Sequence, residues 1–545
     1  MKWFNKGLYK KKIKNSASKN ENSASVESQV ISVEELKEQT VSARLDSNIE
    51  ALHLVFGQNQ DVIFRAFRLG AAPETQACII YIENMVDKTM LNNNIIKPLM
   101  FDSLNNEIHL PGRILRNMML DSALAVSNVK EIGNMDEIVA AILSGGVVIL
   151  TEGLAEAFVI DIRLHHERAV EQPENEVLVR GPREGFTETL TSNLPLIRRQ
   201  VKSPNLIFEY MNIGKVTATD VSIAYIKGLA ATEMINEVKE RLQRIDADGI
   251  LESGYLEEFI EDNPHSPFPQ VLHTERPDRV AAALLQGRVA ILTDGTPFVL
   301  IVPAEFVSFL TSPEDYYERF FLGTAVRLVR IISLIISLLL PSLYIAISTF
   351  HSETIPTRLL ISLTAYRQGL PFPTLVEALF MELTFEILRE AGIRLPRSIG
   401  QAVSIVGALV IGQAAVQAGF VSPIMVIIVA FTGIASFTFP SYNMGVTIRL
   451  LRFPLMLLAG SLGLFGVMIG VIVISIHMAS LRSMGVPYTA SFAPLHLADL
   501  KDVLYRSPWW AMDDRPTELS KTNHRRQAPG LKPSPTSSET KMEDD

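Results

Sequence analysis

The feature that most constrains this chain is a long stretch without charge. Between Ser398 and Ile448 the sequence contains no Asp, Glu, Lys or Arg. That length is about twice the ~20 apolar residues that one bilayer-spanning helix needs. Gly419 and Pro423 interrupt the stretch, and these residue types commonly end one helix or begin another. We therefore predict a hairpin of two transmembrane helices, at about 399–418 and 423–442.

The distribution of charge divides the chain into a polar part and an apolar part. Between Ser398 and Leu481 only Arg449 and Arg452 are charged, whereas the residues before Arg330 are mixed and polar. We expect an all-α, multi-span transmembrane helical domain at 311–481. Its four spans comprise the hairpin and two further helices, at about 331–350 and 453–479.

Four spans would place both ends of the chain on one side of the membrane. The basic N-terminus has no apolar signal region, so we expect that side to be cytoplasmic. Arginines before the first span fit the positive-inside tendency, but Arg389, Arg394 and Arg397 would then lie outside. The segment 355–396 is therefore expected to be amphipathic or re-entrant, and its topology stays open.

Two tails flank these parts. Residues 1–48 are rich in Lys, Ser, Asn and Glu and are expected to be a flexible basic tail. Residues 482–545 are expected to form a cytoplasmic tail that is disordered at its end, after Pro508–Trp510. The net charge of −9 argues against a nucleic-acid partner. The single cysteine, Cys78, excludes an intrachain disulfide and a thiol cluster for a metal.

An internal repeat organises the polar part. Residues 136–153 and 278–295 are identical at more than half of their positions without a gap. Each copy predicts a helix, a glycine cap, an apolar strand, an acidic-Gly turn and a second strand. We infer an α/β N-terminal soluble domain of two related subdomains, 49–179 and 180–310.

A stripe of carboxylates marks the segment before the hairpin. Glu382, Glu386 and Glu390 recur every four residues and fall on one helical face, with Glu377 nearby. Carboxylates at membrane depth are costly and usually face water or a partner charge. They could therefore form a cation path or gate. The alternative is an interfacial helix with Glu386–Arg389 and Glu390–Arg394 pairs on its wet side.

Other candidate sites are less specific. Charge-dense positions of the soluble part could form an interface or couple to a partner, or could be solvated loops: Arg180, Arg183, Glu184, Arg198, Arg199, Arg276 and Asp278. Glycines that would allow close helix packing are Gly407, Gly412, Gly466 and Gly470. We find no nucleotide-binding loop, nucleophile elbow or zinc motif, so we predict no enzyme activity, no catalytic residue, no cofactor and no metal.

Several ordered motifs resemble the A-subunit family of GerA-type spore germination receptors. They run from the soluble part into the helical part and cover about 49–508. They are Arg180-Gly181-Pro182-Arg183-Glu184-Gly185-Phe186, Pro267-Phe268-Pro269-Gln270, Thr274-Glu275-Arg276-Pro277-Asp278, Ser312-Pro313-Glu314-Asp315-Tyr316-Tyr317, Pro371-Phe372-Pro373 and Phe385-Glu386-Ile387-Leu388-Arg389-Glu390-Ala391-Gly392-Ile393-Arg394-Leu395-Pro396-Arg397.

The resemblance implies a multi-pass subunit of a nutrient receptor in the spore inner membrane. It implies a transporter-like B subunit and a lipoprotein C subunit as partners, contact with membrane lipid, and self-association into a homo-oligomeric, cation-conducting channel. A membrane-anchored signalling scaffold without a permeation path is the alternative. A secondary transporter is weaker, because the only clear repeat lies in the soluble part rather than among the membrane spans.

Overall fold

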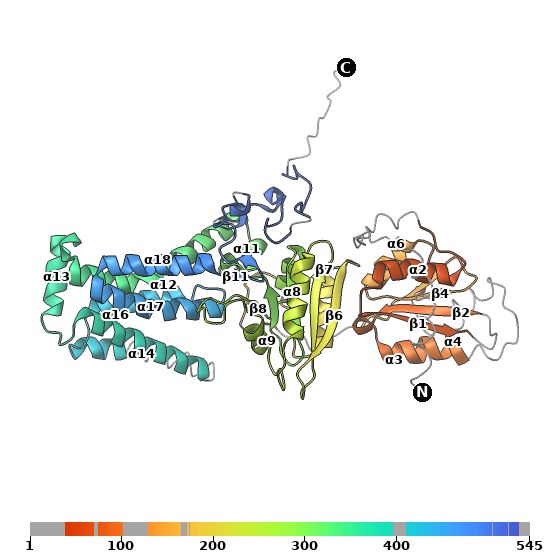
Figure 1. Ribbon diagram of the computed structural model, residues 1–545, viewed down its shortest axis with the longest axis horizontal. Coiled ribbons are helices and arrows are strands. Elements are labelled where there is room, and N and C mark those ends of the chain that lie inside the picture. The colour runs from red at the N-terminus through yellow and green to blue at the C-terminus, as the bar shows by residue number, and fades with distance from the viewer. Residues whose placement is uncertain are drawn as a thin grey trace, which may run out of the picture.

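The computed structural model describes residues 39–69, 75–101, 129–164, 172–173, 175–395, 410–496, 498–503, 505–520 and 523–533. Its three parts follow one another along the long axis: a first α/β subdomain, a second α/β subdomain and a helical region (Figure 1). Gly407 lies outside the described residues. So do most of the predicted N-terminal tail, the first half of the predicted span 399–418, and the last residues of the chain.

The first subdomain is a five-stranded antiparallel sheet with helices on both faces. Its strand order is β1-β2-β4-β5-β3. One apolar core lies on the side of α2 and α6, and the other on the side of η3 and α4. The elements are α2 (Leu45–Phe56), β1 (Val62–Arg68), β2 (Gln76–Ile82), η2 (Glu83–Met85), α3 (Lys88–Met90), η3 (Leu91–Ile96), α4 (Lys97–Phe101), β3 (Val129–Ile132), α6 (Met135–Leu143), β4 (Val147–Thr151) and β5 (Ala157–Ile160).

The second subdomain repeats this plan. Its strand order is β6-β7-β9-β10-β8, which corresponds strand for strand to the first sheet. The elements are α7 (Leu190–Gln200), β6 (Leu206–Ile213), β7 (Thr219–Ile226), α8 (Thr232–Gln243), α9 (Ser253–Ile260), β8 (Leu272–Thr274), α10 (Pro277–Leu285), β9 (Val289–Thr293), β10 (Val299–Val302), η6 (Phe306–Phe309) and α11 (Glu314–Tyr317).

The repeat seen in the sequence is therefore a structural repeat. Gly145 and Gly287 follow α6 and α10 with φ of 86° and 89°, where a side chain would be strained. Gly153 and Gly295, at 87° and 91°, turn the following hairpins. The predicted α/β fold of two related subdomains is confirmed, and both sheets are antiparallel throughout.

The subdomain limits differ from the predicted ones. The first subdomain begins before residue 49, because Val41 and Leu45 are buried in its core and Thr40 bridges to Asn134. At the other limit, Glu176 belongs with the second subdomain, since its carboxylate accepts from Arg279 at 2.6 Å. The polar composition of the first residues placed the predicted start of the first subdomain too late in the chain. The loop-like composition around 175–179 likewise placed the predicted start of the second subdomain too late.

The helical region packs as a bundle at one end of the molecule (Figure 1). Residues 410–417 are also helical. Two helices of the described part, α12 and α17, are long and apolar enough to cross a membrane, and α16 and α18 are shorter apolar helices. The elements are α12 (Phe320–Phe350), η7 (Ser352–Thr354), α13 (Thr357–Arg367), α14 (Thr374–Arg394), α16 (Pro423–Ser436), α17 (Tyr442–Leu462) and α18 (Leu464–Ser480).

Three of the predicted spans need correction. The first helix begins at Phe320 rather than at 331, since the arginines in its first turns are neutralised inside the protein (below). The span predicted at 423–442 ends at Ser436. The predicted single span 453–479 is two helices, α17 and α18, which meet at Gly463 with φ of 64°. The predicted spans leave Arg449 and Arg452 in a connection, but both lie within α17.

The core of the second subdomain continues into the bundle. The cluster on the α7 and α10 face of its sheet includes Met444 and Ile448 of α17, and Leu334 of α12 packs against it. Beyond α18 the chain returns to the subdomain through β11 (Arg482–Ser483), β12 (Val486–Pro487), η8 (Asp499–Asp502) and η9 (Trp509–Ala511). The soluble and helical parts therefore share one core rather than a flexible linker.

The expectation of disorder after Trp510 was wrong for residues 511–520 and 523–533. Leu519 is fully buried and Met512 nearly so, while Arg515 Nε donates to the main-chain oxygen of Leu285 at 3.0 Å. A composition rich in Pro, Ser and charged residues predicted disorder, yet a few buried apolar side chains and main-chain hydrogen bonds are enough to hold the chain. We call residues 498–503, 505–520 and 523–533 the C-terminal segment.

Candidate functional site

On the acidic helix α14, acidic side chains are buried and apolar side chains are exposed, which is the reverse of a helix in a soluble protein. Glu377 and Glu382 are buried at 1% and 0% exposure, whereas Phe380, Leu383 and Ile387 are 54%, 53% and 61% exposed. The predicted stripe is present, but its members do not share one environment. Glu386 is partly buried and Glu390 is exposed, because the apolar packing of α14 involves mainly its N-terminal half.

Glu382 joins three helices through a buried ion pair. Its Oε2 lies 2.5 Å from NH1 of Arg452 on α17. The same guanidinium donates to the main-chain oxygen of Ser337 on α12 at 2.7 Å and to its hydroxyl at 2.9 Å. The other carboxylate oxygen of Glu382 has no hydrogen-bond partner among the described residues. A buried charge pair of this kind is costly to separate, so it fixes α14 against α12 and α17.

Glu377 makes a second internal contact. The main-chain N–H of Ser422 donates to its Oε1, and Ser422 is the N-cap of α16, where its hydroxyl accepts from the N–H of Met425 at 3.2 Å. The carboxylate therefore sits at the positive end of a helix, which favours its charge. Its second oxygen is unpartnered within the described structure.

The two remaining carboxylates of α14 pair with arginines. Glu386 contacts Arg389 on its own helix and lies 3.3 Å from Nε of Arg449 on α17. Glu390 pairs with Arg394 at 2.6 Å, with both side chains exposed. These are the two intrahelical pairs anticipated by the interfacial-helix alternative. The contact with Arg449 was not anticipated, and it supplies the partner charge that keeps an arginine inside an apolar helix.

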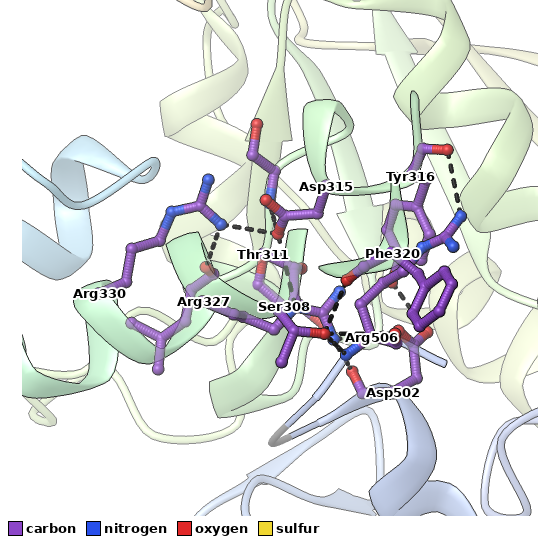
Figure 2. A network of polar contacts seen from close by, with 12 residues as sticks. Ser308, Thr311, Asp315, Tyr316, Phe320, Arg327, Arg330, Asp502 and Arg506 are labelled. Atoms are coloured by element: carbon purple, nitrogen blue, oxygen red, sulfur yellow. Dashed lines mark hydrogen bonds and ion pairs between the residues drawn. The ribbon is translucent and has the colours of Figure 1, made fainter. Parts of the chain in front are cut away.

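A polar junction joins the start of α12 to both the second subdomain and the C-terminal segment (Figure 2). Asp315 Oδ2 accepts from Arg330 at 2.6 Å and lies 3.5 Å from Nε of Arg327. Arg327 also reaches Oδ1 of Asp502 at 3.1 Å. Both arginines are buried, at 1% and 8% exposure. We name these four residues, with Tyr316, the α12 junction.

Tyr316 extends the α12 junction to the chain end. Its hydroxyl donates to Asp502 Oδ2 at 2.8 Å, and its main-chain oxygen accepts from Arg506 and from the Trp509 indole at 3.2 and 3.3 Å. Burial raises the pKa of the Tyr316 phenol, and the charge of Asp502 adds to the rise. In the sequence the basic residues of α12 indicate only membrane orientation. The mixed-charge motif Pro313–Tyr317 was the available signal for the junction.

Three of the candidate coupling residues are buried joints within the chain. Arg198 pairs with Asp61 of the first subdomain at 2.9 Å, with 1% and 3% of the side chains exposed, and so ties the two subdomains together. Arg276 pairs with Asp278 at 2.9 Å and donates to the main-chain oxygen of Pro182 at 2.7 Å. Tyr317 donates to Asp278. Because Tyr317 follows Tyr316 in the chain, this contact links the Arg276–Asp278 pair to the α12 junction.

The other four candidate coupling residues lie at the surface. Arg180 approaches Glu318 at 3.8 Å, and Arg199 approaches Glu184 at 3.7 Å with both about half exposed. Arg183 is exposed. Such loose surface pairs contribute little to stability, so these residues remain available to a partner.

The glycines of α18 lie against α17. A Cβ added at Gly466 would lie 2.1 Å from the main-chain oxygen of Leu458, and one at Gly470 would lie 2.3 Å from Leu455 Cδ2. Gly412 has more room, since its added Cβ would lie 3.4 Å from Val426 Cγ1. The two α18 glycines therefore bring the consecutive helices α17 and α18 into close contact within one chain.

The described ranges contain no cluster of three or more His, Cys, Asp or Glu placed to hold a metal ion. Burial raises the pKa of the Cys78 thiol to about 12, so this thiol stays protonated and unreactive at neutral pH.

Two tandem α/β subdomains fused to an apolar helical bundle with internal acid–arginine pairs form an architecture consistent with a membrane protein. The sequence matches the family described as Bacillus/Clostridium GerA spore germination protein over residues 50–518. The chain belongs to this family, and several of its relatives are named as spore germination proteins.

Individual proteins similar to this chain include one named for spore germination and one uncharacterized membrane protein. Spore germination protein KA of Bacillus subtilis (strain 168) is 46% identical over 498 residues, covering 91% of each chain. The uncharacterized membrane protein YfkQ of the same organism is 43% identical over 497 residues, covering 91% of this chain and 95% of YfkQ. The crystal structure of the N-terminal domain of the A subunit of the Bacillus megaterium spore germinant receptor GerK3 has 34% identity, with a TM-score of 0.39. The match covers 49% of this chain and 98% of the GerK3 domain chain.

Proposed function

We propose that this protein is the A subunit of a nutrient receptor in the spore inner membrane. Several copies would assemble their helical regions into a cation path that opens when a germinant is sensed. The observation that carries the proposal is the inverted helix α14, which buries Glu377 and Glu382 and exposes Phe380, Leu383 and Ile387.

The exposed apolar side chains support burial of the bundle in lipid and against further copies. In water, a contiguous apolar face of this kind would be a liability, and monomeric soluble proteins rarely keep one. The outer faces of the two candidate spans are similar. Ile332 and Ile335 of α12 are 55% and 50% exposed, and Leu450 and Leu457 of α17 are 60% and 52% exposed. A lipid or subunit environment makes this surface favourable.

The acidic residues divide into two roles. Glu377 and Glu382 are held inside one subunit, so we assign them to gating: opening requires a rearrangement of α14 against α12 and α17. Glu386 and Glu390 are less buried, so we assign them to the cation-attracting surface. The Glu390–Arg394 pair is exposed and therefore weak, whereas the partly exposed Glu386 lies against the largely buried Arg389 and Arg449.

The α12 junction would pass the signal from the soluble part to the bundle. It connects the second subdomain, α12 and the C-terminal segment through buried charges, so movement of one element must displace the others. A germinant bound by a partner subunit would favour the open arrangement by binding it more tightly than the closed one. The proposed partners are a transporter-like B subunit and a lipoprotein C subunit.

The proposed orientation places the soluble domain and the C-terminal segment on the cytoplasmic side of the membrane. Arg319, Arg327 and Arg330 stand at that end of α12, as the positive-inside tendency expects.

The test is ion flux through reconstituted receptor. The A subunit is incorporated into liposomes with its B and C subunits, and potassium efflux is recorded after nutrient addition. Replacing Glu386 and Glu390 together by Gln should reduce selectivity for cations over chloride. Glu353→Gln, an exposed carboxylate outside α14, is the matched control and should leave selectivity unchanged. Unchanged selectivity in the double variant would remove both residues from the path. A persistent absence of flux with all subunits and nutrient present would favour a signalling scaffold instead.

A further inference from the structure

A cavity of about 460 Å³ lies between the second subdomain and the C-terminal segment. One wall is formed by α10 and the strand-to-helix connection around Glu305, and the facing wall by the C-terminal segment, including Trp509 and Asp513. Its volume falls within the range of sites for small organic molecules, about 300–1,000 Å³. Figure 2 shows Tyr316 and Asp502, which border this cavity, in the adjoining α12 junction.

Glu305 on this cavity is buried without a hydrogen-bond donor. It is 7% exposed, and its carboxylate lies 3.6 Å from NH2 of Arg288, which is beyond hydrogen-bond length. No hydrogen bond to this carboxylate is found within the described ranges. Arg288 donates from Nη1 to the main-chain oxygen of Pro303 at 2.7 Å and from Nε to Gln286 at 3.2 Å.

Two further carboxylates on the same cavity also have unused acceptors. Asp278 Oδ1 and Asp513 Oδ1 are buried atoms without a hydrogen-bond partner in the described structure, and both residues line the cavity. Leaving buried acceptors unfilled is costly, at about 1–3 kcal/mol each and more for charged groups. These two unfilled acceptors, together with the Glu305 carboxylate that receives no hydrogen bond in the described structure, point to a bound group that donates hydrogen bonds.

Most of the basic side chains that line the cavity already have partners, and Lys501, which also lines it, is exposed to solvent. Arg279 pairs with Glu176 at 2.6 Å, Arg515 donates to main-chain oxygens, and Arg526 lies over the Trp509 ring at 5.9 Å. The buried polar atoms of the cavity lining that lack a partner in the described structure are therefore carboxylate oxygens. This favours a cationic occupant over an anionic one.

From this arrangement we infer that the cavity binds a small organic cation, an amine or guanidine with several N–H donors, whose charge is placed against Glu305. Burial raises the pKa of the Glu305 carboxyl, against the opposing charge of Arg288, and a bound cation would favour the ionised form. Because the C-terminal segment forms one wall, the ligand would hold that segment against the second subdomain. The inference does not rest on the cation-path proposal.

The test uses Trp509, which lines the cavity, as a fluorescent reporter. The chain has three tryptophans, so the background variant Trp3→Phe/Trp510→Phe leaves Trp509 alone. The full-length variant in lipid nanodiscs is titrated with putrescine and with guanidinium at constant ionic strength, and with potassium chloride and succinate as comparison probes. A saturable change in fluorescence is expected with putrescine or guanidinium only. This readout requires no ion flux, so its failure and a failure of the channel proposal are distinguishable.

The variant Glu305→Gln keeps the shape of the side chain and removes its charge. It should weaken cation binding about ten- to hundredfold, because hydrogen bonds to charged groups are the strong ones. Glu258→Gln, on the surface of the same subdomain, should bind as the background does. If Glu305→Gln fails to fold, Asp513→Asn provides the second test and should also bind more weakly. The inference would be overturned if only succinate bound, or if neither cation gave a saturable response. It would also be overturned if both cavity variants bound the cations as tightly as the background variant does.

Discussion

The buried pair Glu382–Arg452 allows the strongest test of how the bundle is held. Replacing Arg452 by Met leaves the carboxylate of Glu382 buried without its partner, and one of its oxygens already has no hydrogen bond among the described residues. Breaking a buried pair in this way costs about 3–5 kcal/mol. The backbone oxygen and hydroxyl of Ser337 also lose their donors. We therefore expect a large loss of stability.

The double variant Glu382→Met/Arg452→Met separates the charge effect from loss of packing. It removes both charges and replaces them with apolar side chains of similar length, which is often close to neutral for a buried pair. Only the two contacts with Ser337 remain unmade, so the double variant should be at least about 2 kcal/mol more stable than the single variant. The matched control is Glu390→Gln/Arg394→Gln. It removes an exposed pair on the same helix and should cost about 0.3–0.5 kcal/mol.

The assay is thermal unfolding of the full-length protein in detergent, followed by circular dichroism at a fixed scan rate. At roughly 2–4 °C per kcal/mol for a region of this size, the single variant should melt about 6–20 °C below the parent. The reasoning is refuted if Arg452→Met melts no lower than the control pair. It is also refuted if the double variant is as unstable as the single one, because the cost would then come from packing rather than from an unpaired charge.

Three further predictions concern other parts of the chain. Arg198→Met should destabilise the joint between the subdomains by about 3–5 kcal/mol, as read by the melting temperature. Arg199 is the exposed neighbour of Arg198, and Arg199→Met should change the stability by less than about 1 kcal/mol. Gly466→Ala should lower the yield of folded protein in size-exclusion chromatography, because its Cβ would meet a main-chain oxygen of α17 at 2.1 Å, while Gly412→Ala should be tolerated. Burial, reinforced by nearby glutamates, raises the pKa of Glu257 from 4.5 to about 8. Between about pH 4.5 and 8, Glu257 therefore keeps its proton in the folded protein and loses it in the unfolded chain. The free energy of unfolding that depends on Glu257 is greatest below about pH 4.5 and falls as the pH rises to about 8. Glu257→Gln should accordingly raise the melting temperature at pH 8 and leave it nearly unchanged at pH 4.5.

The soluble part was predictable from sequence because its information is local. The repeated pattern of helix, glycine, strand and acidic-Gly turn depends on residues within one unit of about 18 positions, and the positive φ of Gly145 and Gly287 follows from that pattern. The order of the strands in the two sheets was not visible, since it depends on pairing between distant segments. Buried joints such as Arg198–Asp61 were missed for the same reason, because their partners are far apart in the chain.

The helical region was harder to predict because charge in a sequence usually indicates contact with water. Arg449 and Arg452 fall between two predicted spans, yet both lie inside α17, where Glu386 and Glu382 neutralise them. The same pairs explain why Glu382 and Glu386 of α14 face inward. A prediction that had matched two arginines of one helix to two glutamates of another would have placed both helices correctly. The spacing of glutamates on α14 alone could not do so. It shows which residues share one face of the helix, but not which helix packs against that face.

The soluble and helical parts are therefore less separable than the distribution of charge suggests. The apolar core on one face of the second sheet includes residues of α17 and is packed by α12, and the α12 junction binds the start of α12 to Asp502 of the C-terminal segment. In the proposed signalling role, a rotation of the second subdomain would strain the buried charges at α12. Because α12 also carries Ser337, which accepts from Arg452, that strain reaches the Glu382–Arg452 pair along a single helix. We propose that a signal arriving at the soluble domain follows this route to the carboxylates of α14.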